Sequence, residues 1–457
     1  MAPPATAGPA SRGTCTELRP DDGDPVKHAL ADVLNPGVRR REVLGWAMFD
    51  FANSGYTTVV LTAVFAAYFV GAVAGGAPWA TFAWTAALSA SHLIVMLSMP
   101  VIGAWADRHG AKKRALLWVA AGSVVSTAAL ALVGPGAVVL GVALIIVSNV
   151  FFAWGESLAA AFLPELARPA AMGRVSGWGW ALGYAGGMLT LGLCLAHVLG
   201  AQAAGQGAAS FVPVTMLITA AMFGAAVLVT ALLLRERALP QPGAPAGTAS
   251  LARAWQDLRG TWRDARRYPD LVWMLACTVA YQGGVAVAIA LAAIYAEQVV
   301  GFAPQETMAL IFVLNIAAML GALAFGHWQD AIGHRRALAI TLVGWIATCL
   351  LAAASTDKAV FWGAATLAGV CMGSSQSAGR AMVGLLVPPA RLAEFFGLWS
   401  FATRVASILG PLTYGAITWA TGGNHRLAIL STAALFVAGL WLLSRVDMAR
   451  GQARAVR

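Results

Sequence analysis

Long apolar segments separated by short polar turns run through most of the chain. Twelve of them have the ~20 residues that an α-helix needs to cross a bilayer core. They are predicted at 44–71, 79–105, 115–133, 138–163, 175–199, 211–234, 271–299, 305–328, 337–354, 360–387, 393–421 and 427–443. This pattern predicts an all-α polytopic membrane protein with twelve transmembrane helices.

The composition agrees with this fold class. Hydrophobic residues make up 59% of the chain and charged residues 11%, which is far more apolar side chain than a soluble core can bury. The net charge of +10 raises the alternative of a nucleic-acid partner. However, the basic residues lie in short turns beside apolar segments and not along a helix face. We therefore expect the lipid bilayer as the surroundings and no nucleic-acid partner.

Basic residues are distributed unevenly among the turns. All but four of the 30 Lys and Arg residues fall in the two tails and in the turns that follow even-numbered segments, and the exceptions are Lys358, Arg380, Arg404 and Arg426. Cytoplasmic loops carry an excess of Lys and Arg, so we predict that both termini are cytoplasmic. Arg far outnumbers Lys, a bias typical of GC-rich bacterial genomes, and we therefore expect the bacterial inner membrane.

The chain divides into two related halves. We predict a disordered cytoplasmic tail at 1–41, a six-helix bundle at 42–234, a cytoplasmic linker at 235–268, a second six-helix bundle at 269–444 and a cytoplasmic tail at 445–457. An amphipathic stretch at 251–267 is expected on the membrane surface. The turn GAWADRHGAKKR at 103–114 recurs 223 residues later as GHWQDAIGHRR at 326–336. Two related halves are typical of secondary transporters.

These two turns also carry a resemblance to a known family. The first resembles the signature loop of the major facilitator superfamily, and the second resembles its weaker copy. The stretches GWAMFDFANSGY at 45–56 and GSSQSAGRAMVGLLVPPARLAEFFGLWSFATRVASILGP at 373–411 resemble the vacuole-effluxer-like branch, whose fungal members are linked to amino-acid release. The resemblance implies two pseudo-symmetric bundles that rock about a midplane cavity lined by the first, fourth, seventh and tenth segments.

The resemblance also implies gates in the two turns. Asp107 would be a latch that breaks as the halves rock, with Arg108 and Arg114 as its partners. From the residues alone, Lys112, Lys113 and Arg114 are interpreted as topology signals that hold the loop inside. The gating residues are Gly103, Asp107, Arg108, Gly110, Arg114, Gly326, Asp330, Gly333 and Arg336.

Four ionisable side chains lie inside apolar segments: Asp50, Glu156, Arg380 and Arg404. A charge at the bilayer centre costs about 2.5–3.5 kcal/mol on insertion scales, so such residues usually face a cavity and pair. The repeat places Glu156 at the position equivalent to Arg380, and we predict that the two approach each other. The pair is a gate, a site for the ammonium and carboxylate of a zwitterion, or a structural salt bridge. For Asp50, a structural bond to a helix end or to Arg404 is the alternative to substrate contact.

Polar side chains at helical spacing extend this candidate cavity. Asp50, Asn53 and Thr57 share one face of the first segment, and Gln376 and Arg380 repeat the pattern in the tenth. The candidate substrate and proton site consists of Asp50, Asn53, Thr57, Asn149, Glu156, Tyr281, Gln282, Gln376, Arg380 and Arg404.

The sequence contains no Walker A, HExxH or GxSxG motif, and its five cysteines are scattered. We therefore predict no enzyme activity, no cofactor and no metal. We expect a monomeric secondary active transporter of a small polar solute, such as an amino acid or a related zwitterion. Coupling to protons is expected because a carboxylate in a low dielectric binds a proton more readily. A drug or metabolite/proton antiporter is the alternative on the same fold, and a non-transporting membrane scaffold or sensor is the alternative of another class.

Overall fold

The computed structural model describes residues 33–77, 79–240, 260, 263–302 and 304–456, and this part of the chain is almost entirely helical. The helices lie within a few residues of the predicted segments. The first half contains α2 with its continuation η1, α3 and η2 (Arg40–Tyr56, Thr57–Ala63, Phe65–Tyr68 and Phe69–Val73), α4 (Ala80–Arg108), α5 (Lys112–Ala129), α6 (Val138–Ala160), the short α7 (Leu163–Leu166), α8 (Met172–Ala203) and α9 (Ala208–Leu233).

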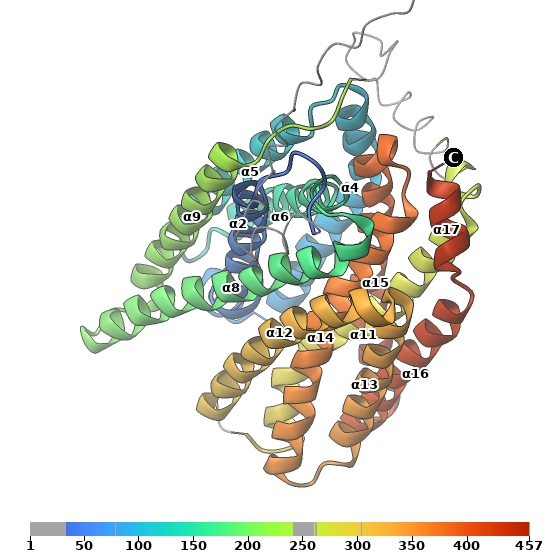
Figure 1. Cartoon of the computed structure of the whole chain (residues 1–457). Helices are drawn as coiled ribbons and strands as arrows, with labels where there is room; N and C mark the ends of the chain where they lie inside the picture. Colours follow the sequence, from blue (N-terminus) through green and yellow to red (C-terminus); the bar gives the residue numbers. More distant parts are fainter. Residues whose placement is uncertain (1–32, 78, 241–259, 261–262, 303, 457) are drawn as a thin grey trace, which may run out of the picture.

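The second half has the same number of long helices (Figure 1). They are α11 (Pro269–Gln298), α12 (Pro304–Ile332), α13 (His334–Ala354), α14 (Lys358–Leu386), α15 (Leu392–Ala420) and α16 (His425–Ser444), followed by the short α17 (Met448–Ala455). Among the described residues, eleven spans are long and apolar enough to cross a membrane. The twelfth long helix is α14, which is less apolar because it carries Arg380 and a polar face. The predicted fold class is confirmed.

The two halves use the same pattern of helix contacts. In the first half α2 packs against α8 and α9, α4 against α6, and α5 against α6 and α9. In the second half α11 packs against α15 and α16, α12 against α14, and α13 against α14 and α16. Each pair in one half therefore has its counterpart at the equivalent place in the other, as expected of an internal structural repeat.

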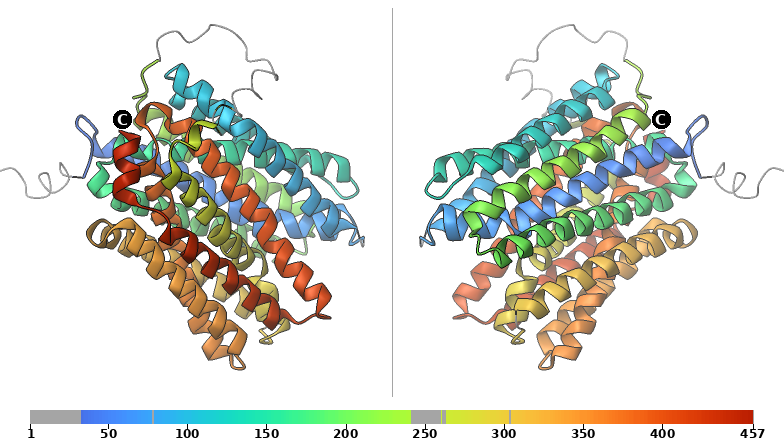
Figure 2. Two further views of the ribbon diagram at one scale, coloured as in Figure 1. Left: turned by 90° about the vertical axis from the view of Figure 1, so that its right-hand side faces the viewer. Right: turned by 90° about the vertical axis from the view of Figure 1, so that its left-hand side faces the viewer.

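The halves meet through two equivalent helix pairs, α4 with α15 and α8 with α12. Glycines allow the close approach. A methyl group at Gly103 of α4 would collide with the carbonyl oxygen of Ala393 at the start of α15, and one at Gly177 of α8 with that of Ala322 of α12. From this contact, α8 and α12 diverge toward the other end of the molecule (Figures 1 and 2).

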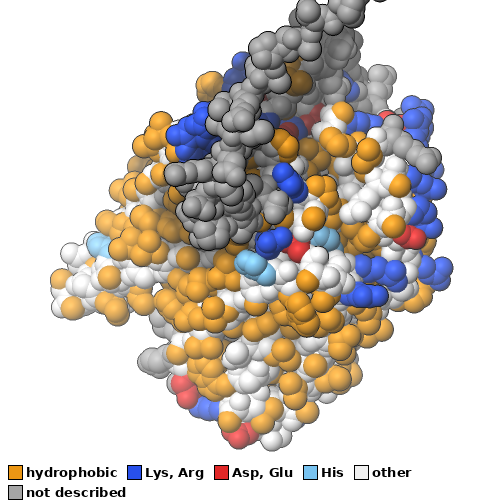
Figure 3. Space-filling model, in the orientation of Figure 1, with side chains coloured by type: hydrophobic (Ala, Val, Ile, Leu, Met, Phe, Trp, Pro, Cys, Tyr) orange, Lys and Arg blue, Asp and Glu red, His pale blue; other side chains and the backbone are white. Residues whose placement is uncertain are grey.

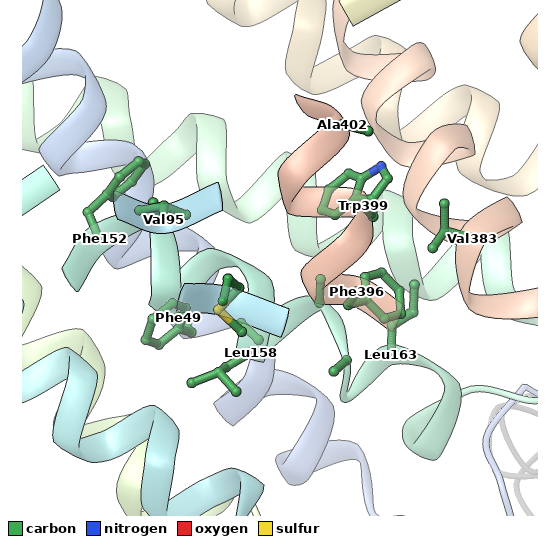
Figure 4. Packing of buried hydrophobic residues seen from close by; sticks show 14 of the residues in the cluster. Phe49, Val95, Phe152, Leu158, Leu163, Val383, Phe396, Trp399 and Ala402 are labelled. Atoms are coloured by element: carbon green, nitrogen blue, oxygen red, sulfur yellow. The ribbon is translucent and has the colours of Figure 1, made fainter. Parts of the chain in front are cut away.

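Lys and Arg side chains gather at one end of the molecule, which we call the basic end (Figure 3). It contains the start of α2, the α4–α5 turn and the start of α13, together with the segments 235–240 and 445–455. The opposite end carries Lys358 and Arg426. Apolar side chains fill the interface near the basic end, where Leu158 and Leu163 belong to the same buried cluster as Val383, Phe396 and Trp399 of the second half (Figure 4).

The described parts of the two tails pack against the basic end. Arg168 donates from Nε to the carbonyl oxygen of Leu34 at 2.9 Å, so residues 33–38 pack against the chain before α8 although the sequence analysis placed them in a disordered tail. Helix α17 was not predicted, and Arg450 joins it to Asp270 of α11 at 2.6 Å. Most of the predicted amphipathic stretch at 251–267 lies outside the described residues.

Candidate functional site

Among the described residues, two ion pairs inside the predicted apolar segments connect the halves, and neither is the predicted pair of Glu156 with Arg380. Arg380 NH1 of α14 donates to Asp50 Oδ2 of α2 at 2.7 Å, and Arg404 NH2 of α15 donates to Glu156 Oε2 of α6. The predicted pairing is wrong because α6 packs on α15, whereas α14 packs on α8 beside α2. The internal repeat gives two side chains the same depth in the membrane, but it does not make them neighbours. Asp50 likewise binds Arg380 and not Arg404.

Each of the three guanidinium nitrogens of Arg380 donates a hydrogen bond to the protein. Its NH2 group donates to the carbonyl oxygen of Ser176 at 2.8 Å and its Nε to Ser176 Oγ at 3.2 Å. The guanidinium lies 4.8 Å from the ring centre of Trp46 and 5.3 Å from that of Trp180. Arg380 is only 3% exposed. Because α2 and α8 belong to the first half, this arginine ties α14 of the second half to both.

Gly179 of α8 makes room for this ion pair. A Cβ atom at this position would lie 2.5 Å from Asp50 Oδ2 and 2.6 Å from Arg380 NH2. The same face of α8 carries Gly183, where a Cβ atom would lie 2.9 Å from Ser54 Oγ. Small residues four apart let helix backbones approach closely, and here they bring α2 and α8 together around Asp50.

The pair of Glu156 and Arg404 is more open. The Glu156 side chain is 31% exposed and that of Arg404 is 11% exposed. Arg404 Nε is buried and has no hydrogen-bond partner within the described part of the chain. Arg404 therefore has a guanidinium nitrogen that donates no hydrogen bond, whereas all three guanidinium nitrogens of Arg380 donate one.

The other predicted cavity residues form local contacts around these pairs. Thr57, which begins the π-helical stretch η1, donates to the carbonyl oxygen of Asn53 at 3.3 Å. Asn149 donates to Ser91 Oγ of α4 at 2.6 Å. In the second half Gln282 Nε2 donates to Gln376 Oε1 at 2.6 Å, and Tyr281 is fully buried with its hydroxyl against Gly379. The oxygens Asn53 Oδ1 and Asn149 Oδ1 are buried and find no partner among the residues that the structure describes.

Sequence reasoning missed three side chains that hold Arg380, namely Ser176, Trp46 and Trp180. Ser176 and Trp180 lie in the fifth segment, which the resemblance does not assign to the cavity. A signal was present, since 176–184 reads SGWGWALGY and combines aromatic rings with glycines on one helix. Such a helix can place rings against a cation from a neighbouring helix.

Asp107 joins the halves at the basic end. Its Oδ2 accepts a hydrogen bond from the backbone N–H of Glu394 in the first turn of α15 at 2.9 Å, where the helix dipole favours a negative charge. Lys112 lies 3.2 Å from Asp107 and 2.6 Å from Glu165, and it is 2% exposed. Lys112 is therefore a buried ion-pair partner of Asp107, a role that the interpretation as a topology signal did not include. The implied partner Arg114 is exposed instead, with its guanidinium 6.0 Å from the ring centre of Trp105.

Asp330 makes the equivalent contact from the second half. It accepts from the backbone N–H groups of Gly173 at 2.8 Å and Arg174 at 3.0 Å, at the start of α8. The turns themselves depend on glycine, because Gly110 has φ +55° and Gly333 has φ +92°, values that favour glycine. The remaining gating residues are Gly326, which packs against Gly173 and Gly177, Arg108, which is half-buried, and Arg336, which is exposed.

Comparison with known proteins places this arrangement in context. The family model for vacuole effluxer Atg22-like proteins matches residues 80–456. The chain is 28% identical over 410 residues to the uncharacterized MFS-type transporter YxiO of Bacillus subtilis (strain 168), covering 88% of this chain and 94% of that protein. It is 26% identical over 223 residues to autophagy-related protein 22-1 of Penicillium rubens, covering 46% of this chain and 38% of the fungal protein.

Solved structures share the fold at low sequence identity. The human organic anion transporter MFSD10 (TETRAN) matches with a TM-score of 0.67 and 16% identity, covering 88% of this chain and 99% of that one. FucP, a major facilitator superfamily transporter in the outward conformation, matches with a TM-score of 0.66 and 14% identity, covering 89% and 98%. Identities this low support a shared architecture and carry no information on the solute.

Proposed function

Because the chain belongs to the vacuole effluxer Atg22-like family and is a membrane transporter of the major facilitator type rather than an enzyme, we propose that it moves a small zwitterion by secondary active transport. The solute is an amino acid or a related molecule with one ammonium and one carboxylate group. It binds between Glu156 and Arg404, with protons as the coupling ion.

One observation carries this assignment: Glu156 and Arg404 are partly exposed and Arg404 retains an unpartnered Nε. The guanidinium fork can donate two parallel hydrogen bonds to a carboxylate, and Glu156 offers its carboxylate to an ammonium group. A bound zwitterion would replace one ion pair by two, so no buried charge is left without a partner. Arg380 supports no such role, since Asp50, Ser176 and two tryptophans already occupy it.

We further propose that the basic end faces the cytoplasm of a bacterial cell, in keeping with the excess of Lys and Arg in cytoplasmic loops. Asp107, Asp330 and the pair of Asp50 with Arg380 all tie the halves together toward this end. The halves diverge toward the other end (Figure 1). The described arrangement is then the outward-facing one, and the three ties are the cytoplasmic gate that breaks when the halves rock.

Coupling follows from competition for Glu156. The carboxylate of Glu156 can pair with an ammonium group, whereas its protonated form cannot. Proton and solute then exclude each other at the same side chain, which favours exchange of solute against protons.

Solute counterflow in proteoliposomes tests the proposal. Proteoliposomes that contain the purified protein are loaded with an unlabelled amino acid, sugar or cationic drug. The uptake of the same compound in radiolabelled form is then followed, with and without a pH gradient. The proposal predicts saturable exchange of amino acids that a pH gradient accelerates. Exchange of cationic drugs alone would favour the antiporter alternative, and absence of flux for every class would favour a scaffold or sensor.

A further inference from the structure

A groove of about 470 Å³ opens on the surface of the molecule between α2, α8 and α12. Leu44 of α2 and Leu182 of α8 line it, together with Leu323 of α12. All three helices are candidate membrane spans, and Leu44 is 48% exposed. The groove therefore faces the hydrocarbon, and its volume lies within the roughly 300–1,000 Å³ range of small-molecule sites.

The end of this groove nearest the basic end is cationic. Arg40 lines it at the first turn of α2, and Arg39 and Arg41 beside it are also exposed. From Arg40 the wall continues along α2 to Ala47, a rise of about 10 Å at 1.5 Å per residue. The groove thus combines a positive charge at the membrane surface with an apolar channel that runs from there into the membrane.

We propose that this groove binds one acyl chain of an anionic phospholipid from the leaflet at the basic end, with the lipid phosphate at Arg40. An apolar channel without the cation would accept any lipid, and a cation without the channel would attract only a diffuse layer of anionic headgroups. The combination selects a negatively charged headgroup and holds its chain in place.

The groove is built from both halves, because α2 and α8 belong to the first and α12 to the second. Next to it, Gly177 of α8 meets the carbonyl oxygen of Ala322 of α12, at the contact that closes the basic end. Separating α8 from α12 would remove one wall. A ligand that binds one of two states shifts the population toward that state, so the bound lipid stabilises the arrangement closed at the basic end. This inference does not depend on which solute is transported.

Native mass spectrometry of the detergent-purified protein tests the binding step. Phosphatidylglycerol and phosphatidylcholine with identical acyl chains are titrated separately onto the wild type. Since each Arg near the surface contributes about 1 kcal/mol toward anionic lipid, phosphatidylglycerol should bind at least about fivefold more tightly. Equal affinities for the two lipids would overturn the proposal.

Two variants separate the headgroup contact from the chain contact. Arg40→Gln should remove the preference for phosphatidylglycerol. Ala185→Phe, which fills the groove from α8, should weaken the binding of both lipids several-fold. Arg454→Gln on α17 and Leu189→Phe, an exposed position on α8 outside the groove, are the matched controls and should leave binding unchanged. Equal losses of lipid affinity in the variants and the controls would contradict a specific site. So would an Ala185→Phe variant that binds lipid normally but forms fewer dimers, because the groove would then be a contact between two copies of the chain.

A distance measurement tests the effect on state. Spin labels are placed at Arg114→Cys and Arg336→Cys, one exposed position at the basic end of each half, with Cys15 replaced by Ser because the four described cysteines are buried. Adding phosphatidylglycerol to phosphatidylcholine nanodiscs should increase the short-distance population, and Arg40→Gln should abolish that increase. An unchanged distribution, or an equal change in Arg40→Gln, would overturn the coupling of lipid to state.

Discussion

Arg380 of α14 and Asp50 of α2 are 330 residues apart in the chain and form an ion pair of 2.7 Å across the boundary between the two halves. The arginine is 3% exposed and the Asp50 side chain is 15% exposed. Breaking a buried ion pair on one side leaves an uncompensated charge, which costs more than the pair contributes when it is intact. Removing one charge of this pair should therefore destabilise the protein more than removing both.

Asp50→Asn should lower the thermal stability of the purified protein markedly, since the loss of one partner of a buried pair costs about 3–5 kcal/mol. The double variant Asp50→Asn with Arg380→Gln removes both charges and should recover part of this loss. Thermal unfolding in detergent measures both. If the double variant is as unstable as the sum of the two single variants, the two residues are not coupled.

Gly179→Ala should reproduce the effect of breaking the ion pair, because its methyl group would stand within 2.6 Å of Asp50 Oδ2 and Arg380 NH2. Gly192→Ala on the same helix is the matched control. A Cβ atom there meets nothing within 4 Å, so the higher helix propensity of Ala should leave stability unchanged or raise it by up to ~1 kcal/mol. Equal melting temperatures of the two variants would show that the side chains around Gly179 can move to accommodate a methyl group.

Asp107→Asn should open the basic end. The substitution removes the charge that binds Lys112 and the first turn of α15, and a hydrogen bond to a charged group contributes about 1.5–3 kcal/mol. The ratio of closed to open molecules should therefore fall about tenfold or more, seen as a larger long-distance population between spin labels at Arg114→Cys and Arg336→Cys.

The control for this opening is Asp357→Asn, which changes an equivalent contact within one half. Asp357 accepts from the backbone N–H of Ala359 at the start of α14, far from the basic end. Its substitution should leave the distance distribution unchanged. If Asp107→Asn also leaves the distribution unchanged, Asp107 is not a latch.

Much of the fold was predictable from the sequence because a bilayer imposes one length and one polarity on every span. The helices begin and end within a few residues of the predicted bounds, and these include α14, which is less apolar than the others. Helix α17 was missed because eight residues are too few for a periodic pattern to stand out. It is held by Arg450 on Asp270, a contact between distant parts of the chain.

The pairing of charges was not predictable for a different reason. The internal repeat fixes the depth of Glu156 and Arg380, but the rotation of each helix about its axis decides which side chains meet. That rotation depends on packing between helices, such as the fit of α2 against Gly179 and Gly183. The pairing of Lys112 was likewise not predictable, since the sequence does not distinguish it from the other basic residues of the turn, and only the fold brings Glu165 and Asp107 to it.

Arg404→Lys and Glu156→Gln should strongly reduce solute exchange while the protein stays folded. Lysine keeps the charge of Arg404 but cannot donate two parallel bonds to a carboxylate, and glutamine keeps the shape of Glu156 without its charge. Loss of one charge-assisted contact should weaken binding about tenfold to a hundredfold. Melting temperatures close to that of the wild type establish that both variants are folded.

The most direct test is counterflow of a matched set of solutes: an amino acid, the amine that lacks its carboxylate and the acid that lacks its ammonium group. We expect that the wild type exchanges the amino acid alone. Exchange should fall at least about tenfold in Glu156→Gln and in Arg404→Lys, and pH should have no effect on the residual flux of Glu156→Gln. Equal exchange of all three solutes, or wild-type flux in both variants, would contradict the assignment of Glu156 and Arg404 as the solute site.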